Sequence, residues 1–370
     1  MQKNLVGLVR NDPRFKRIYD RARASRSRVT SVYDISSRCN LFCEGCLFFN
    51  RDGTFEGDTS GLTAAKYDQM FAGEKQRGVT YPLLAGAEPS LEQKTLRIAS
   101  TYWQNGMVHT NGIKPIDPAL PFRLYVSVWG ARELTAKWRG ADCYEKTLKS
   151  AAADPRAIMN YTINSKNIDD IYTVVSDCAR LGLQITFQVY SPTADYSDYL
   201  SAEAPAEEHL YIQGEDSSDN LILTEADDLR AHQAICTVID DFPETVVFTK
   251  ALSRWIFASP VTFADVPEDG TAPAGCFAGR DPQHQHRQLG GKVEDGKSCG
   301  HPSINCRTCR AYTMIFPTFF AEKLAKPMSR EEAMDFLDAH HVFDVVYEGH
   351  RGEVTWHPRV TQAACLELTA

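Results

Sequence analysis

The sequence lacks long apolar runs and any excess of basic residues. Its longest apolar stretch, Ala311–Ala321, contains Pro317 and two threonines and falls well short of the ~20 residues of a membrane-spanning helix. The first residues carry a charge every few positions and contain no apolar core of a signal peptide. Lys and Arg number 40 against 48 Asp and Glu, a net charge of −8 that argues against a broad surface for nucleic acid or lipid. We expect a soluble, cytoplasmic protein without nucleic-acid or membrane partners.

Internal repeats and low-complexity tracts are absent as well. Hydrophobic residues make up 43% and charged residues 24% of the chain, which excludes intrinsic disorder as its main state. A length of 370 residues suits one large α/β barrel with appended elements. Against these ordinary values, a count of eleven cysteines is high. Because cytoplasmic thiols stay reduced, such cysteines more often bind metal or do chemistry than form disulfides.

Between residues 28 and 192, short apolar runs alternate with amphipathic segments, which is typical of strands and helices in a parallel α/β sheet. Thr63 is expected to cap the helix after the first strand, and Ser90 with Gln93 to form a capping box for the next helix. The expected strands are Val29–Ile35, Tyr81–Ala85, Met107–Thr110, Arg123–Val128, Ile158–Ile163 and Leu183–Val189.

In the last three of these strands, polar residues alternate with apolar ones. The alternating polar set comprises Tyr125, Ser127, Trp129, Asn160, Thr162, Asn164, Gln184, Thr186, Gln188 and Tyr190. If the apolar set packs against helices, the polar set lines the inside of a curved sheet. A closed eight-stranded barrel fills its interior with apolar side chains, so a polar interior predicts a wider, partly open barrel around a polar ligand. A half-exposed antiparallel sheet is the alternative.

The remaining segments are less regular. We expect a helical extension at 1–27, the barrel at 28–192, a linker with helices at 193–258, and a cysteine-rich domain at 259–370. His232 and Cys236 are four residues apart and could bind metal, but their apolar neighbours favour a buried pair, and Cys178 is also expected in the core. The further elements expected are a loop at Ser191–Asp219, helices at Glu225–Asp240 and Arg330–His340, and a strand at Glu353–His357.

Three cysteines follow the first strand directly. Cys39, Cys43 and Cys46 have the spacing C-x3-C-x2-C. Structural zinc sites use four ligands, usually as two separated pairs, and a fully ligated [4Fe–4S] cluster uses four thiolates. Three thiolates would leave one iron open to bind and activate another molecule.

This triplet resembles the signature of the radical S-adenosylmethionine (SAM) superfamily. The resemblance covers residues 28–192 and implies a partial (β/α)6 TIM-like barrel. It also implies a [4Fe–4S] cluster on Cys39, Cys43 and Cys46, whose open iron chelates SAM. An electron from the cluster then cleaves SAM to methionine and a 5′-deoxyadenosyl radical that abstracts hydrogen. A reducing partner such as flavodoxin or ferredoxin is implied as well.

Further segments resemble the SAM-binding elements of that family in the expected order. The stretch Leu84–Pro89 resembles its GGEP element, with an alanine replacing the second glycine. The stretch Asn160–Asn167 resembles its adenine-contacting region. Gly45 departs from the pattern, because many members carry an aromatic there that stacks near adenine; Phe42 is a candidate to compensate. The residues that the resemblance assigns to SAM are Gly86, Ala87, Glu88, Ser127, Asn164 and, more weakly, Gln188.

Four further cysteines lie in a Gly/Pro-rich region near the carboxyl terminus. Cys276, Cys299, Cys306 and Cys309 are separated by 22, 6 and 2 residues. This loosely resembles the auxiliary-cluster domains of many radical SAM enzymes and predicts a second iron–sulfur cluster. Zinc is the alternative, with a histidine replacing one thiol, and free thiols are another. The candidate replacements are His284, His286 and His301.

Arg307 and Arg310 flank this second site and either hold a substrate oxygen or are ordinary solvated charges. Two cysteines, Cys143 and Cys365, remain unassigned.

The combined prediction is an oxidoreductase or epimerase of natural-product biosynthesis acting on a sugar or aminocyclitol. Dehydrogenation would pass an electron to the auxiliary cluster. In epimerisation, Cys143, Cys236 or an unligated C-terminal cysteine would return a hydrogen atom. One alternative is a peptide-modifying, RiPP-maturase-like enzyme, although about 28 residues before the first strand leave little room for a peptide-recognition module. A non-catalytic iron–sulfur or zinc protein is another.

Overall fold

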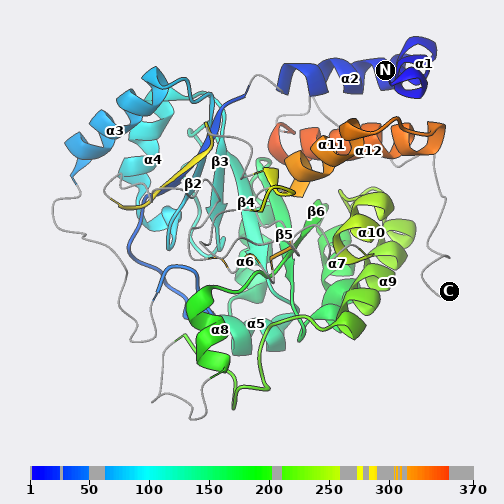
Figure 1. Cartoon of the computed structure of the whole chain (residues 1–370). Helices are drawn as coiled ribbons and strands as arrows, with labels where there is room; N and C mark the ends of the chain where they lie inside the picture. Colours follow the sequence, from blue (N-terminus) through cyan, green and yellow to red (C-terminus); the bar gives the residue numbers. More distant parts are fainter. Residues whose placement is uncertain are drawn as a thin grey trace.

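The computed structural model describes residues 2–25, 28–49, 63–201, 211–258, 273–277, 283–289, 304, 306, 309–310 and 315–349. Its centre is an open sheet in which six strands run parallel and lie side by side in chain order (Figure 1). A seventh strand, β7, pairs with the free edge of β1, so the spatial order is β6-β5-β4-β3-β2-β1-β7. The strands are β1 Thr30–Asp34, β2 Tyr81–Ala85, β3 Met107–Thr110, β4 Arg123–Val128, β5 Ala157–Ile163, β6 Ile185–Val189 and β7 Gln285–Arg287.

Helices between the strands cover the outer face of this sheet (Figure 1). These helices are α3 Ala64–Gln76, α4 Gln93–Tyr102, α5 Arg132–Arg139, α6 Tyr144–Ala152 and α7 Ile171–Arg180. After β6 come α8 Ala194–Leu200, α9 Glu225–Asp241 and α10 Lys250–Ala258, and two short 3-10 helices lie at Pro89–Leu91 and Ile168–Asp170. The predicted α/β class and the open six-stranded barrel are therefore confirmed.

The alternation along the strands decides which side chains meet the helices. The apolar sets of β4, β5 and β6 are buried in the main core. The parallel register aligns their polar partners across the inner face, with Ser127 beside Asn160 and Thr162 beside Gln188. The sheet thus packs apolar side chains outward and keeps a polar inner wall, as the sequence predicts.

Two terminal segments close the amino-terminal end of the strands. Helix α12 (Arg330–Tyr347) crosses this end, where Arg123 at the start of β4 donates to the carbonyl oxygens of Val345 and Val346, both at 3.2 Å. The Tyr81 hydroxyl at the start of β2 donates to the carbonyl oxygen of Tyr347 at 2.5 Å. Three further helices pack against α12 (Figure 1): α1 (Lys3–Asn11), α2 (Pro13–Ser25) and α11 (Ile315–Ala325).

Several expectations about local structure need correction. The stretch Ser191–Asp219 is not wholly a loop, because α8 forms there with Thr193 as its N-cap. Ser90 does not cap α4: Pro89 opens a 3-10 turn, and Glu92 precedes the helix. Helix α12 runs seven residues beyond the predicted end at His340.

Other expectations hold or lie outside the described residues. Cys178 is fully buried, and His232 lies buried beside Cys236 with its Nδ1 2.9 Å from the Ser253 hydroxyl. Thr63 caps α3. The strand expected at residues 353–357 falls in a part that the structure does not describe. The described helices include none long and apolar enough to cross a membrane.

Candidate active site

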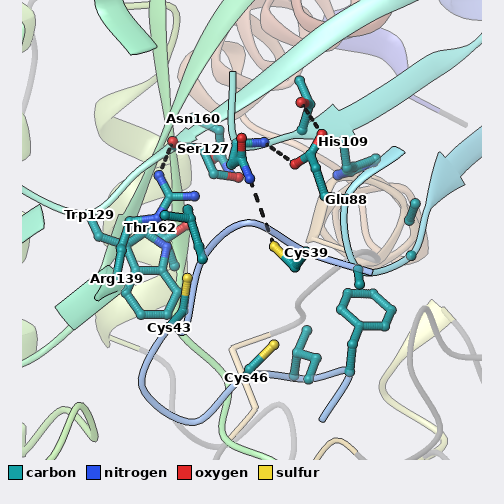
Figure 2. Close-up of a pocket in the computed structure, with 18 of the residues that line it drawn as sticks. Cys39, Cys43, Cys46, Glu88, His109, Ser127, Trp129, Arg139, Asn160 and Thr162 are labelled. Carbon is teal, nitrogen blue, oxygen red and sulfur yellow. Dashed lines mark hydrogen bonds between the residues drawn. The ribbon is translucent and has the colours of Figure 1, made fainter. Parts of the chain in front are cut away.

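The loop that follows β1 brings the three cysteines of the C-x3-C-x2-C motif to one cavity. Cys39, Cys43 and Cys46 line this cavity at the carboxyl-terminal ends of the parallel strands. Figure 2 shows their sulfur atoms facing one another across a shared space below the strand ends. Parallel α/β sheets place their ligand sites at this edge, so the loop lies where chemistry is expected.

Glu44 anchors the loop from within. Its buried carboxylate accepts hydrogen bonds from the Tyr196 hydroxyl at 2.6 Å and from the backbone N–H groups of Gln213 and Gly214. Burial raises the pKa of Glu44, while these donors oppose the rise. A residue between two cysteines therefore ties the loop to α8 and to the segment after it.

Gly45 has a structural reason to be a glycine. Its φ is +54°, in the left-handed region that favours glycine. A Cβ at this position would overlap the Tyr190 hydroxyl and come within 3.1 Å of the Tyr196 ring. Tyr190 at the end of β6 also lines the cavity. Tyr190 thus occupies the space that a side chain at position 45 would need, and position 45 is where the sequence departs from the family pattern.

The thiols of the triplet are held in a poorly solvated place. Burial raises the pKa of Cys43 and of Cys46. It raises the pKa of Cys39 to about 12, and the neighbouring Cys43 thiol adds to the rise at Cys39. Arg139 lies beside Cys43 and opposes the rise there. Without a metal these groups would remain protonated, and a metal would be needed to hold them as thiolates.

Cys39, Cys43 and Cys46 offer three thiol groups from one loop to the same cavity. Among the described residues, no group of three His, Cys, Asp or Glu side chains forms a site for a single metal ion. Thiolates are the ligand type of a [4Fe–4S] cluster, in which each thiolate binds a different iron atom.

Glu88 connects the ends of β2 and β3. Its carboxylate accepts from the Ser90 N–H at 2.9 Å, the Thr110 hydroxyl at 2.6 Å and the Asn111 N–H at 2.8 Å. A carboxylate has about four acceptor positions, so roughly one is left for an ammonium group in the cavity. Gly86 and Ala87 line the cavity beside it, and a Cβ on Gly86 would meet the backbone of Ile35 and Ser36, directly after β1.

The inner wall is polar where β4, β5 and β6 end. Ser127, Asn160, Thr162 and Gln188 line the cavity, and the Asn160 amide donates to Gln188 at 3.2 Å. Asn164, which the resemblance assigns to SAM, does not line it: its Oδ1 accepts from a backbone N–H in the turn after β5. Thr162 and Asn160, two and four residues before Asn164, are the residues of β5 that reach the cavity.

Sequence reasoning missed two polar residues near the cysteines. Arg139, on α5, is buried and donates to the Ser127 carbonyl oxygen at 2.6 Å. Asn111, after β3, places its amide 3.8 Å from the Cys39 sulfur. Neither has a sequence signal, because one looks like a surface charge on an amphipathic helix and the other like an ordinary turn residue.

A third missed feature is the pairing of Asp34 with His286, which the sequence suggested only as a substitute zinc ligand. Asp34, at the end of β1, lines the cavity and lies 2.9 Å from the Nε2 of His286 on β7. His109, on β3, also lines the cavity, and burial lowers its pKa to about 4, so it is neutral at pH 7. The strand that carries His286 has no hydrophobic pattern to reveal it.

The C-terminal cysteines are only partly described. Cys309 is buried, and its sulfur lies 3.7 Å from the hydroxyl of Ser191, which lines the cavity. Cys276 packs into the main core. Cys306 is half-buried, and Cys299, Cys365, His301 and Arg307 fall outside the described residues.

The other candidates of this region have partners elsewhere. The imidazole of His284 lies 2.8 Å from the Thr30 hydroxyl, and Arg310 forms an ion pair with Asp228 at 3.0 Å. Of the two cysteines named as hydrogen-atom donors within the barrel, Cys143 lies close to Cys43 and Arg139 without lining the cavity. Cys236 is buried on α9 and does not line it either, and it is disulfide-bonded, so the expectation of a donor thiol there is wrong.

No protein-family model and no curated protein matches this chain. Its similar solved structures include crystal structures of Streptococcus suis SuiB. One of SuiB itself is 12% identical, covers 88% of this chain and 66% of that one, and has a TM-score of 0.49. SuiB bound to S-adenosylmethionine is 14% identical over 59% of this chain and 49% of that one, with a TM-score of 0.45.

SuiB bound to its precursor peptide SuiA is 15% identical over 60% of this chain and 49% of that one, with a TM-score of 0.43. The match therefore spans about half the length of the two ligand-bound neighbours. Identities and TM-scores this low assign no activity by themselves.

Proposed function

We propose that this chain is a radical SAM enzyme that abstracts a hydrogen atom from a polar substrate. The observation that carries the proposal is the three-thiol loop, whose cysteines all line one cavity at the carboxyl-terminal ends of parallel strands. The SAM-bound SuiB structure among the neighbours agrees with it.

Cys39, Cys43 and Cys46 would hold a [4Fe–4S] cluster, and Glu44 and Gly45 keep their loop in place. When bound, the cluster and SAM would supply the 5′-deoxyadenosyl radical. Arg139 contributes a buried positive charge beside Cys43, which would balance part of the negative charge of the thiolates.

The SAM itself would be oriented by the ends of β2, β4 and β6. Glu88 keeps an acceptor for the SAM ammonium group, and Gly86 allows its strand end to lie against β1. Ser127 and Gln188 offer hydrogen-bonding groups for the ribose and carboxylate. We replace Asn164 in this set by Asn160 and Thr162, because these are the β5 side chains that line the cavity.

Two substrate classes are candidates. The cavity-lining polar side chains that are not assigned to SAM, Asp34, His109 and Asn111, favour a small polyhydroxylated molecule such as a sugar or aminocyclitol. The SuiB structure with its precursor peptide favours a peptide, and this is the class that the comparisons support better. Mass spectrometry of products from candidate peptides and cyclitols separates the two.

The reaction outcome is proposed as dehydrogenation or epimerisation. Dehydrogenation needs a one-electron acceptor, which the C-terminal cysteines would provide as an auxiliary iron–sulfur site. Epimerisation needs a thiol near the substrate. Cys309, close to cavity-lining Ser191, is better placed than Cys143, and Cys236 is disulfide-bonded. A product two mass units lighter than the substrate would establish dehydrogenation, and an unchanged mass would exclude it.

The central test is SAM cleavage. Anaerobically reconstituted and reduced protein should form 5′-deoxyadenosine, and Cys43→Ala should abolish it. A failure of well-reconstituted wild-type protein to form 5′-deoxyadenosine would leave a non-catalytic iron–sulfur or zinc protein as the better description.

The second metal site has its own test. We expect about eight iron atoms per chain for two [4Fe–4S] clusters, falling to about four in Cys306→Ala/Cys309→Ala. About four in both proteins would assign the C-terminal cysteines to zinc or to free thiols, and a zinc assay distinguishes these.

A further inference from the structure

The side of the cavity formed by β1 carries a carboxylate with an incomplete set of hydrogen bonds. The Asp34 and His286 side chains are only 4% and 3% exposed, and Asp34 Oδ2 lies 2.9 Å from His286 Nε2. Asp34 Oδ1 is buried and has no hydrogen-bond partner among the described residues. Leaving a buried carboxylate oxygen unpaired is costly, so a donor from a ligand would stabilise it.

Asp34 differs in this respect from the other carboxylate of the cavity. Glu88 already accepts three hydrogen bonds from the chain, whereas the described residues give Asp34 only the one to His286. Nearby His109 is neutral at pH 7, since burial lowers its pKa to about 4, and so supplies no compensating charge.

The position of this pair separates it from the proposed SAM contacts. Those contacts come from β2, β4, β5 and β6, while Asp34 ends β1 and His286 lies on the strand that borders β1. The register places His286 opposite Val32, which also lines the cavity, so the two polar side chains belong to the same inner face. This inference rests on the proposed function: with SAM bound along β2 and β4–β6, the β1 face is the part of the cavity wall that a substrate can contact.

We propose that Asp34 binds a hydroxyl or ammonium group of a small polyol or amino-polyol substrate, with His286 as the residue that positions it. An ionised carboxylate only accepts hydrogen bonds, so the substrate must supply the donor. His286 fixes the carboxylate through Oδ2 and leaves Oδ1 for the ligand. An ammonium group would add charge to the contact, and a hydroxyl group would not.

The test is calorimetric titration of the reconstituted enzyme, with and without SAM, using 2-deoxystreptamine and myo-inositol as probes. Wild-type protein should bind at least one probe, and Asp34→Asn should weaken that binding tenfold or more. A loss confined to the amine identifies an ammonium contact, and an equal loss for both probes identifies a hydroxyl contact. Binding of neither probe by the wild type overturns the inference.

Two control variants sharpen the result. Asp344→Asn removes another buried carboxylate, on α12 and away from the cavity lining, and should change probe affinity less than twofold. His286→Gln keeps a donor for Asp34 and should cost less than threefold, while His286→Leu should approach the loss in Asp34→Asn. Equal losses in Asp34→Asn and Asp344→Asn would overturn the inference as a nonspecific effect.

The same samples also report on the proposed function. Formation of 5′-deoxyadenosine after reduction, together with failed probe binding, would overturn the substrate inference alone. Absence of 5′-deoxyadenosine in wild-type protein would overturn the radical SAM proposal, while an Asp34-dependent probe affinity would still establish a polyol site.

Discussion

The two ends of the barrel treat buried polar groups differently. At the amino-terminal end, Arg123 donates to three backbone carbonyl oxygens, and Arg156 donates to those of residues 116, 117 and 120. At the carboxyl-terminal end, Asp34 Oδ1 and Asn160 Oδ1 are buried without partners among the described residues. Buried polar groups in folded proteins are normally paired, and at the first end the exception is Asp344 Oδ2 on α12, which also lacks a partner among the described residues. The unpaired groups of the second end differ because their residues line the cavity, where a ligand can pair with them.

The largest expected contrast is between two cysteine variants. Cys43→Ala removes a proposed iron ligand at the carboxyl-terminal end and should abolish cluster loading and SAM cleavage, a loss of at least about 100-fold. Cys178→Ala removes a fully buried thiol on α7 and should lower stability by about 1–2 kcal/mol while retaining iron. Iron analysis and thermal unfolding check both. Equal iron in the two variants would contradict the assignment of Cys43.

A glycine variant probes the loop itself. Gly45→Ala forces a side chain into a left-handed position and against the Tyr190 hydroxyl, so iron loading should fall several-fold. Tyr190→Phe removes that hydroxyl, and the double variant should regain part of the loading. Iron-to-protein ratios of the four proteins measure the coupling. Strictly additive losses would show that the hydroxyl is not the obstacle.

An arginine variant probes the opposite end. Arg123→Met leaves buried carbonyl oxygens of α12 without a donor and should lower the free energy of unfolding by about 2–4 kcal/mol. It should leave the iron content of the folded protein unchanged, because Arg123 lies away from the cysteine loop. Denaturant unfolding and iron analysis of the same preparation check this. A loss of iron without a loss of stability would contradict a purely stabilising role for the amino-terminal end.

The smallest expected effect concerns an exception at the amino-terminal end. Burial raises the pKa of Asp344 to about 7, so the folded protein retains a proton there that the unfolded chain releases near pH 4. The contribution of this carboxyl to stability is therefore present at low pH and is lost as pH rises through 7. Asp344→Asn should stabilise the protein by roughly 1–2 kcal/mol at pH 8 and by little at pH 4. Melting temperatures across this range test it, and a pH-independent difference would contradict it.

The sequence predicts the barrel well because its signals there are local. The bounds of β2, β3 and β4 match the predicted strands, since each is an apolar run between turn residues. Helix α8 escapes prediction because the sequence ADYSDYL reads as a polar loop, and its helix is supported by the Thr193 cap and by tyrosines buried against the cysteine loop. Elements stabilised by distant contacts leave no periodic pattern.

The candidate site also contains residues that the sequence predicts and residues that it does not. The cysteine triplet is a motif and could be found from its spacing alone. Arg139 and His286 could not, because their places in the site follow from tertiary packing between separate elements. The sequence assigned Asn164 to SAM, whereas Asn160 and Thr162 line the cavity, because β5 ends before Asn164. Strand ends are the least certain part of a sequence-based assignment.

The pairing of β7 with β1 has a consequence for how the protein is made. His286 reaches Asp34 across 252 residues of sequence. On the ribosome, the cysteine loop and all six strands that support it emerge long before their neighbour on the β1 side. A nascent chain could therefore present its iron ligands before His286, the residue proposed to position Asp34, has been synthesised. Loading of metal and acquisition of substrate specificity would then be separate events in the life of one molecule, with the edge of β1 exposed between them.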